Sequence, residues 1–161
     1  MKVLFLDIDG VLNGHEYDAL AESCTIKKEC ITNFSKILTQ TDARIVVSSA
    51  WRYMISRGAM TLRGFEYLLR THGLAGIQNR IIGITREDLD QTSKTERGLE
   101  IEEWLRDHPE VTHYLVIDDM DFGITVRGHP FLQTDGTTGL TEADADKAIR
   151  MLRGSLTQRV K

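Results

Sequence analysis

Short apolar runs alternate along the chain with segments of helical spacing, and two of these runs end in a pair of acidic residues. Residues 4–10 read Leu-Phe-Leu-Asp-Ile-Asp-Gly, and residues 114–119 read Tyr-Leu-Val-Ile-Asp-Asp. A short apolar run bounded by polar or glycine residues is typical of a strand that is buried on both faces. We therefore predict two central strands that each end in two carboxylates.

The rest of the pattern predicts further strands at 44–47, 80–84 and 131–134. Helices are expected over about 27–38, 61–72 and 97–108, after residue 141, and as a short segment that ends near residue 58. Thr25 and Thr141 are the expected N-caps of the first and last long helices. This alternation predicts an α/β fold of three layers around a central, mostly parallel sheet. One domain over residues 1–161 is expected, without a large inserted cap.

The acidic strand ends call for a counter-charge. Asp7 and Asp9 are two residues apart, a spacing that puts both side chains on one face of a strand. Carboxylates so close repel each other unless a cation lies between them, and oxygen ligands favour a hard cation, most simply Mg²⁺. Gly10 permits a sharp turn whose backbone N–H groups can approach an anion. The pattern predicts a metal and phosphate site, and the alternative is a strand end with solvated acids.

Residues 7–12 read Asp-Ile-Asp-Gly-Val-Leu. They resemble the first motif of the haloacid dehalogenase (HAD) superfamily of phosphotransferases, Asp-x-Asp-Gly-(Val/Thr)-Leu. The resemblance implies that Asp7 attacks phosphorus and becomes an aspartyl-phosphate. It also implies that Asp9 acts first as general acid and then as general base.

Two later segments resemble the second and third HAD motifs, in the expected order. Ser48 follows the predicted strand at 44–47, with Ser49 as the fallback, and its hydroxyl would hydrogen-bond a phosphoryl oxygen. Arg97, with Lys94 as the alternative, would stabilise the negative charge of the nucleophile and of the transferring phosphoryl group.

The acidic pair at 118–119 resembles the fourth motif. Asp119 is expected to bind Mg²⁺ directly or through water, and Asp118 to orient nearby groups. With the first motif, this implies a metal site built from Asp7, Asp9, Asp118 and Asp119. The family also implies a Rossmann-like, five-stranded sheet in the order 5-4-1-2-3, with a minimal cap or none.

Three short segments narrow the resemblance to the HAD-type domains of RNA repair proteins, relatives of the polynucleotide 3′-phosphatase domain. They are Ser-Ser-x-Trp-Arg at 48–52, Arg-Gly-x-Glu-Ile-x-x-Trp-Leu at 97–105 and Thr-Gly-Leu-Thr-Glu-Ala-Asp at 138–144. The implied reaction is Mg²⁺-dependent hydrolysis of a phosphomonoester on an RNA or DNA end. A nucleotide and a phosphoprotein are the alternative substrates.

Four residues near these motifs are expected to contact the substrate: Gly10, Ser49, Trp51 and Arg52. Arg52 would bind a second anionic group or the phosphate itself. Trp51 has two interpretations, because it would either stack on a base or pack in the core.

A hypothesis of another class is a phospho-accepting signalling module like a response-regulator receiver. Receivers also gather acids, a hydroxyl and a basic residue around Mg²⁺. In them, however, the acidic pair precedes the phospho-accepting Asp on a later strand, and the Lys comes near the end of the domain. Here the basic candidates precede Asp118. A catalytically silent binding domain is a third hypothesis.

The charged residues are unevenly distributed along the chain. The chain carries a net charge of −4, yet residues 44–97 hold 9 Lys and Arg against 5 Asp and Glu. Such a basic segment either faces a polyanionic substrate or consists of solvated arginines on helix surfaces.

No apolar run is long enough to cross a bilayer, so no membrane partner is expected. The first strand begins too close to Met1 for a signal peptide. Cys24 and Cys30 are too few for a disulfide framework and are expected to be reduced thiols. We expect a cytoplasmic protein, and the sequence leaves its oligomeric state open.

Overall fold

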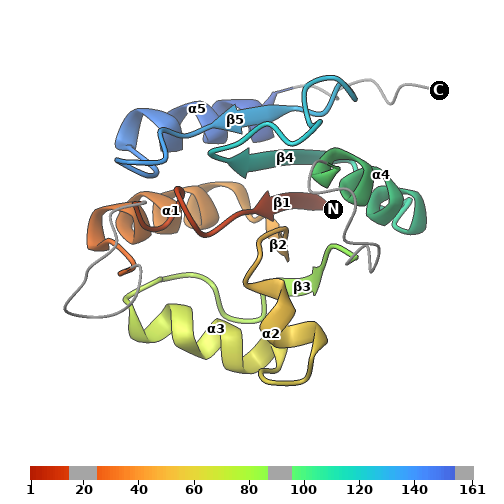
Figure 1. Ribbon diagram of the computed structural model, residues 1–161. Coiled ribbons are helices and arrows are strands. Elements are labelled where there is room, and N and C mark those ends of the chain that lie inside the picture. Colours follow the sequence, from red (N-terminus) through yellow and green to blue (C-terminus); the bar gives the residue numbers. More distant parts are fainter. Residues whose placement is uncertain (15–24, 87–95, 155–161) are drawn as a thin grey trace.

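The computed structural model describes residues 1–14, 25–86 and 96–154, and its strands form one parallel sheet (Figure 1). The strands are β1 (Lys2–Leu6), β2 (Arg44–Val47), β3 (Ile81–Ile84), β4 (His113–Asp118) and β5 (Phe131–Gln133). The sheet has five strands in the order β3-β2-β1-β4-β5, and every neighbouring pair is parallel. This is the predicted order read from the opposite edge, and it places β1 beside β4.

Helices cover both faces of the sheet. They are α1 (Lys28–Thr41), α2 (Arg52–Ser56), α3 (Leu62–Thr71), α4 (Arg97–Asp107) and α5 (Glu142–Arg153). The larger apolar cluster combines sheet residues with buried side chains of α1, α3 and α5, and the smaller cluster combines others with Ile101 of α4. The predicted three-layer α/β fold is therefore confirmed.

The alternation within β1 explains why this strand lies at the centre. Leu4 and Leu6 belong to the larger cluster, whereas Val3 and Phe5 belong to the smaller one. All four side chains are fully buried. A strand with apolar residues on both faces is stable only where helices cover both sides, as in a parallel sheet.

The N-cap prediction for the last helix is confirmed, and the prediction for the first helix is wrong. Thr141 caps α5 through a capping box with Asp144. The N-cap of α1 is Lys27, which makes no side-chain capping bond, rather than Thr25. The backbone N–H of Lys27 instead donates to Leu12 O at 2.8 Å, so a contact with the first turn sets where α1 begins.

Other expectations are tested only in part. Cys30 is a buried free thiol, while Cys24 lies outside the described residues. No helix among the described residues is long and apolar enough to cross a membrane. The expectation of a single domain with little or no cap stays a prediction.

Candidate active site

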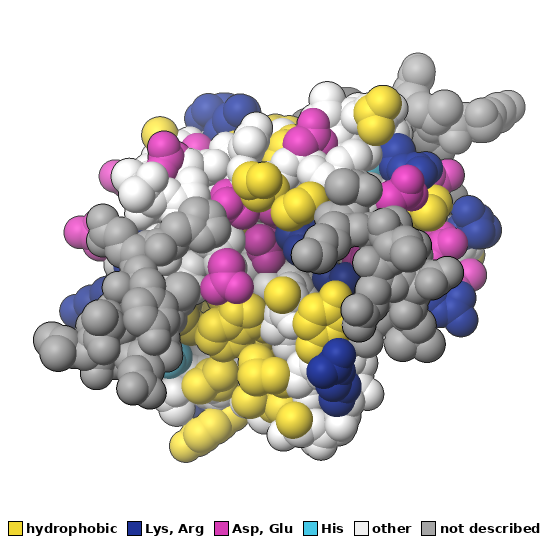
Figure 2. All heavy atoms as spheres, in the orientation of Figure 1, with side chains coloured by type: hydrophobic (Ala, Val, Ile, Leu, Met, Phe, Trp, Pro, Cys, Tyr) yellow, Lys and Arg dark blue, Asp and Glu magenta, His cyan; other side chains and the backbone are white. Residues whose placement is uncertain are grey.

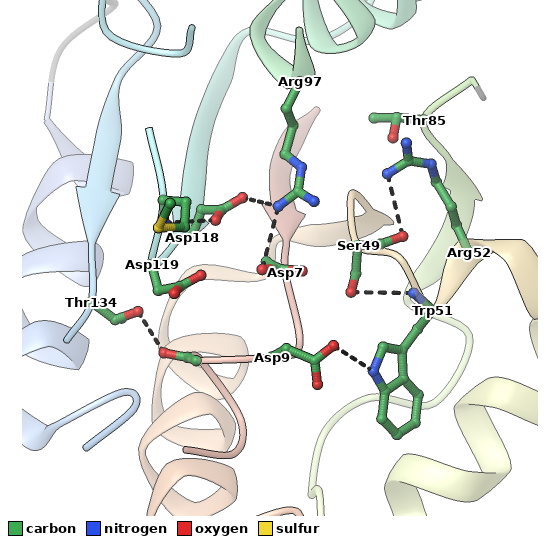
Figure 3. A network of polar contacts seen from close by, with 12 residues as sticks. Asp7, Asp9, Ser49, Trp51, Arg52, Thr85, Arg97, Asp118, Asp119 and Thr134 are labelled. Carbon is green, nitrogen blue, oxygen red and sulfur yellow. Dashed lines mark hydrogen bonds and ion pairs between the residues drawn. The ribbon is translucent and has the colours of Figure 1, made fainter. Parts of the chain in front are cut away.

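The ends of β1 and β4 bring the two acidic pairs together. Leu6 of β1 is in register with Ile117 of β4, and the Asp7 N–H donates to Ile117 O at 3.0 Å. Because parallel strands end at the same edge of a sheet, Asp7 and Asp118 leave the sheet side by side. Figure 3 shows these two residues with Asp119 around one small space.

Asp7, Asp118 and Asp119 form the acidic group of the site. Each offers a carboxylate oxygen, and these oxygens lie within 4.8 Å of one another. Their exposed fractions are 5%, 0% and 8%. Gly10 lets the turn pass close to this group, since a Cβ there would lie 2.6 Å from Asp119 Cγ and its φ is +76°.

Arg97 opens α4 and reaches into the acidic group. Its guanidinium lies 3.3 Å from the Asp7 carboxylate and makes a close ion pair with Asp118. Burial nevertheless raises the pKa of Asp118 to about 7, against the opposing effect of Arg97. Burial also raises the pKa of Asp7.

The charges of this group fit a divalent cation. When all three buried carboxylates are ionised, they and the one guanidinium carry a net charge of −2. All three acidic ligands are oxygens, which suits a hard ion such as Mg²⁺. The predicted Arg97 therefore lies at the site, while its alternative Lys94 lies outside the described residues.

The carboxylate of Asp9 is not a member of this group, although its spacing from Asp7 led us to expect a metal ligand. β1 ends at Leu6, so the alternation of a strand no longer applies at residues 7–9. The turn aims Asp9 towards Trp51, whose Nε1–H donates to it at 3.0 Å (Figure 3). Asn13 Nδ2 donates to its other oxygen at 2.8 Å.

The backbone of Gly10 is also engaged. Its N–H donates to Asn13 Oδ1 at 2.8 Å, and its carbonyl accepts from the Thr134 hydroxyl at 2.8 Å. Gly10 therefore shapes the turn and its own N–H is used within it, while the expectation that N–H groups of this turn approach an anion stays a prediction. Asn13 and Thr134 were missed in the sequence, although Asn13 directly follows the acidic motif.

The two serines after β2 differ in their surroundings. The Ser48 N–H donates to Leu6 O at 2.9 Å, so Ser48 continues the pairing of the sheet. Its buried hydroxyl has no partner among the described residues. Ser49 is the next residue, and a hydrogen bond from its side chain lowers the pKa of Asp7. The Ser49 Oγ also accepts the Trp51 backbone N–H at 3.4 Å. The choice between Ser48 and its fallback Ser49 stays a prediction.

Arg52 is buried in a network behind the site. Its exposed fraction is 5%, and its guanidinium donates to Glu100 at 2.8 Å and to Ser49 O at 3.3 Å. Glu100 also accepts from the Thr85 hydroxyl at 3.2 Å. The expected substrate arginine thus connects the loop after β2 to α4, the helix that carries Arg97.

Arg52→Met is expected to lower the free energy of unfolding by about 3 kcal/mol, because the variant leaves the charged and largely buried Glu100 without this partner. Urea unfolding of the variant measures the loss. Arg57→Met, at an exposed arginine of the same segment, is the matched control and should stay within about 0.5 kcal/mol of the parent. Equal effects of the two substitutions would contradict the role given to Arg52.

Comparison with known families agrees with this geometry. The family model for the HAD domain in Swiss Army Knife RNA repair proteins matches residues 3–145. This range contains the acidic group, Arg97 and both serines. No curated protein matches the chain.

Proposed function

The chain belongs to the family of HAD domains found in Swiss Army Knife RNA repair proteins, and from this premise we propose that it is a Mg²⁺-dependent phosphomonoester hydrolase acting on a phosphorylated nucleic-acid end. Membership of the family supports a HAD-type hydrolase. The observation that carries the finer proposal is the acidic group of Asp7, Asp118 and Asp119 facing Arg97, with Asp9 held beside it.

The acidic group would hold the metal ion. Asp7, Asp118 and Asp119 would supply oxygen ligands from two neighbouring strand ends, and a divalent cation would offset their negative charge. A bound Mg²⁺ would reduce the repulsion between the Asp7 carboxylate and an anionic phosphoryl group. Asp9 keeps only a proton-transfer role in this proposal.

The reaction runs in two displacements at phosphorus. Asp7 attacks, and the bond from phosphorus to the ester oxygen breaks while Asp9 donates a proton to that oxygen. Asp9 then takes a proton from water, which attacks the aspartyl-phosphate and releases inorganic phosphate and free Asp7. Arg97 and the Ser49 hydroxyl stabilise the negative charge on the phosphoryl oxygens.

A nucleic-acid end is the preferred substrate for two reasons. The family is that of RNA repair proteins, and the side chain of Asp9 is partly open to solvent. Figure 2 shows acidic side chains near the centre of this face, with hydrophobic side chains below them over α2 and the start of α3. The end of a nucleic-acid chain would reach an open face of this kind more readily than it would reach a closed pocket.

Phosphate release tests this proposal. One oligonucleotide is prepared with a 3′-phosphate and again with a 5′-phosphate, and a mononucleotide is assayed beside them, each with Mg²⁺ or with EDTA. We expect Mg²⁺-dependent release from one of the oligonucleotide ends. Release from the mononucleotide alone would contradict the nucleic-acid substrate and favour a nucleotidase, and release that persists in EDTA would contradict the metal.

The raised pKa of Asp118 predicts how the stability of the metal-free protein depends on pH. The folded protein keeps the proton of Asp118 up to about pH 7, whereas the unfolded chain releases it near the ordinary value of 3.8. The contribution of Asp118 to stability is therefore greatest below that ordinary value and is lost as the pH rises through about 7. Thermal unfolding in EDTA should show a steeper fall from about pH 5 to about pH 8 for the parent than for Asp118→Asn. Unfolding temperatures that fall equally with pH in the parent and in Asp118→Asn would refute this contribution of Asp118.

A further inference from the structure

The carboxylate of Asp9 is held by two N–H donors, one on each oxygen. Asn13 Nδ2 donates to Oδ1 at 2.8 Å, and Trp51 Nε1 donates to Oδ2 at 3.0 Å. The donors come from different parts of the chain, because Asn13 follows the turn after β1 and Trp51 precedes α2 (Figure 3). Two bonds from separate elements fix both the position and the plane of the carboxylate.

Both donors are themselves held in place. Asn13 is fully buried, and its Oδ1 accepts the Gly10 N–H at 2.8 Å, so its amide nitrogen has to face Asp9. The Trp51 ring packs edge-on against Phe65 of α3, with ring centroids 6.1 Å apart. The structure therefore offers a rigid frame for Asp9, as a proton-transfer group requires.

The chemistry of the two donors suits a group that has to transfer a proton. An indole N–H and an amide N–H only donate hydrogen bonds, and neither takes a proton from a carboxylic acid. They hold Asp9 without competing for the proton that goes to the leaving oxygen. Resting on the proposed function, we propose that Trp51 and Asn13 are positioning residues that orient Asp9 for proton transfer to the substrate.

Trp51→Phe tests this most directly, because it keeps an aromatic ring next to Phe65 and removes the N–H donor together with part of the indole. The readout is kcat/KM for two monoesters, since this ratio covers the steps up to phosphoryl transfer. An alkyl ester, such as the phosphorylated oligonucleotide, needs a proton on its leaving oxygen. p-Nitrophenyl phosphate releases a stable anion, so its hydrolysis depends much less on proton donation by Asp9.

We expect Trp51→Phe to lower kcat/KM about tenfold or more for the alkyl ester and less than about threefold for p-nitrophenyl phosphate. Trp104→Phe is the matched control and should change neither value. Trp104 packs against Phe5, with centroids 5.4 Å apart, on the side of the sheet that carries α4.

Asn13→Asp is the second variant. It keeps an acceptor for the Gly10 N–H but presents a carboxylate oxygen to Asp9 where a donor stood. Repulsion should turn Asp9 away, so the alkyl ester again loses more activity than the aryl ester. Thermal unfolding of each variant shows whether it is folded at the assay temperature.

The outcomes distinguish a failure of the positioning role from a failure of the proposed hydrolase function. Equal losses for both esters in Trp51→Phe, or no loss for either, would overturn the positioning role while an active parent leaves the hydrolase intact. A parent that releases phosphate from neither ester would overturn the proposed function and the positioning role with it. A selective loss with the alkyl ester, in a folded variant, supports the positioning role.

Discussion

Asp7→Asn should lower kcat by about a thousandfold or more while the protein stays folded. An amide is a poor nucleophile at phosphorus, so the variant loses the covalent step altogether. The fold should tolerate the change. Burial raises the pKa of Asp7 because a charged carboxylate is unfavourable there, and the uncharged Asn side chain has the same shape without the charge. Phosphate release and thermal unfolding measure the two effects.

The matched control for this substitution is Asp146→Asn. Asp146 lies on α5 and pairs with Lys36 at the surface, with side-chain exposed fractions of 46% and 31%. Turnover of this variant should equal that of the parent. Near-normal turnover of Asp7→Asn would mean that Asp7 is not the nucleophile.

Arg97→Met is expected to have the second-largest effect, on both activity and stability. The variant removes the only cation that the described part of the site places between Asp7 and Asp118. Loss of one partner of a buried ion pair costs about 3–5 kcal/mol. The transferring phosphoryl group loses the same charge, so kcat should fall about a hundredfold or more.

Mg²⁺ should restore part of the stability of Arg97→Met, because it supplies positive charge to the same carboxylates. Arg97→Lys keeps the charge and should retain more activity than Arg97→Met. Lys94→Met decides between the two basic candidates of the sequence, and we expect it to leave kcat within about threefold of the parent. A greater loss in Lys94→Met than in Arg97→Met would reverse the assignment.

The layers of the fold were predictable because the sequence patterns that indicate strands and helices are local. Each strand is a short apolar run, and each long helix shows its buried face in the spacing of a few residues. The meeting of Asp7 with Asp118 was predictable for the same reason, since parallel strands end at one edge of the sheet. The family resemblance added the strand order, which the sheet confirms.

The finer placement of the site depends on contacts that no local pattern reveals. β1 ends at Leu6, so Asp9 points to Trp51, which lies 42 residues further along the chain. Arg52 was expected at the substrate, but its partner Glu100 is 48 residues away in sequence. A buried arginine and an exposed one look alike in a sequence, and only the fold shows which acid pairs with it.

The sequence alone could not decide between the two serines. Both hydroxyls follow the same apolar run, and the sequence favoured Ser48 because it comes first. The N–H of Ser48 pairs with Leu6 O of β1, while the side chain of Ser49 interacts with Asp7 and lowers its pKa, so the choice between the two hydroxyls stays a prediction.

The central claim is that Asp7 carries the phosphoryl group during each turnover. The most direct measurement is an acid quench during steady-state hydrolysis, followed by mass spectrometry of the peptide that contains residues 7–9. We predict a phosphoryl group on Asp7 that appears with substrate and disappears once the substrate is consumed. A phosphoryl group on Asp9 or Asp118, or none at all, would contradict the account. A phospho-Asp that persists for minutes after the substrate is gone would favour a receiver-like signalling module instead.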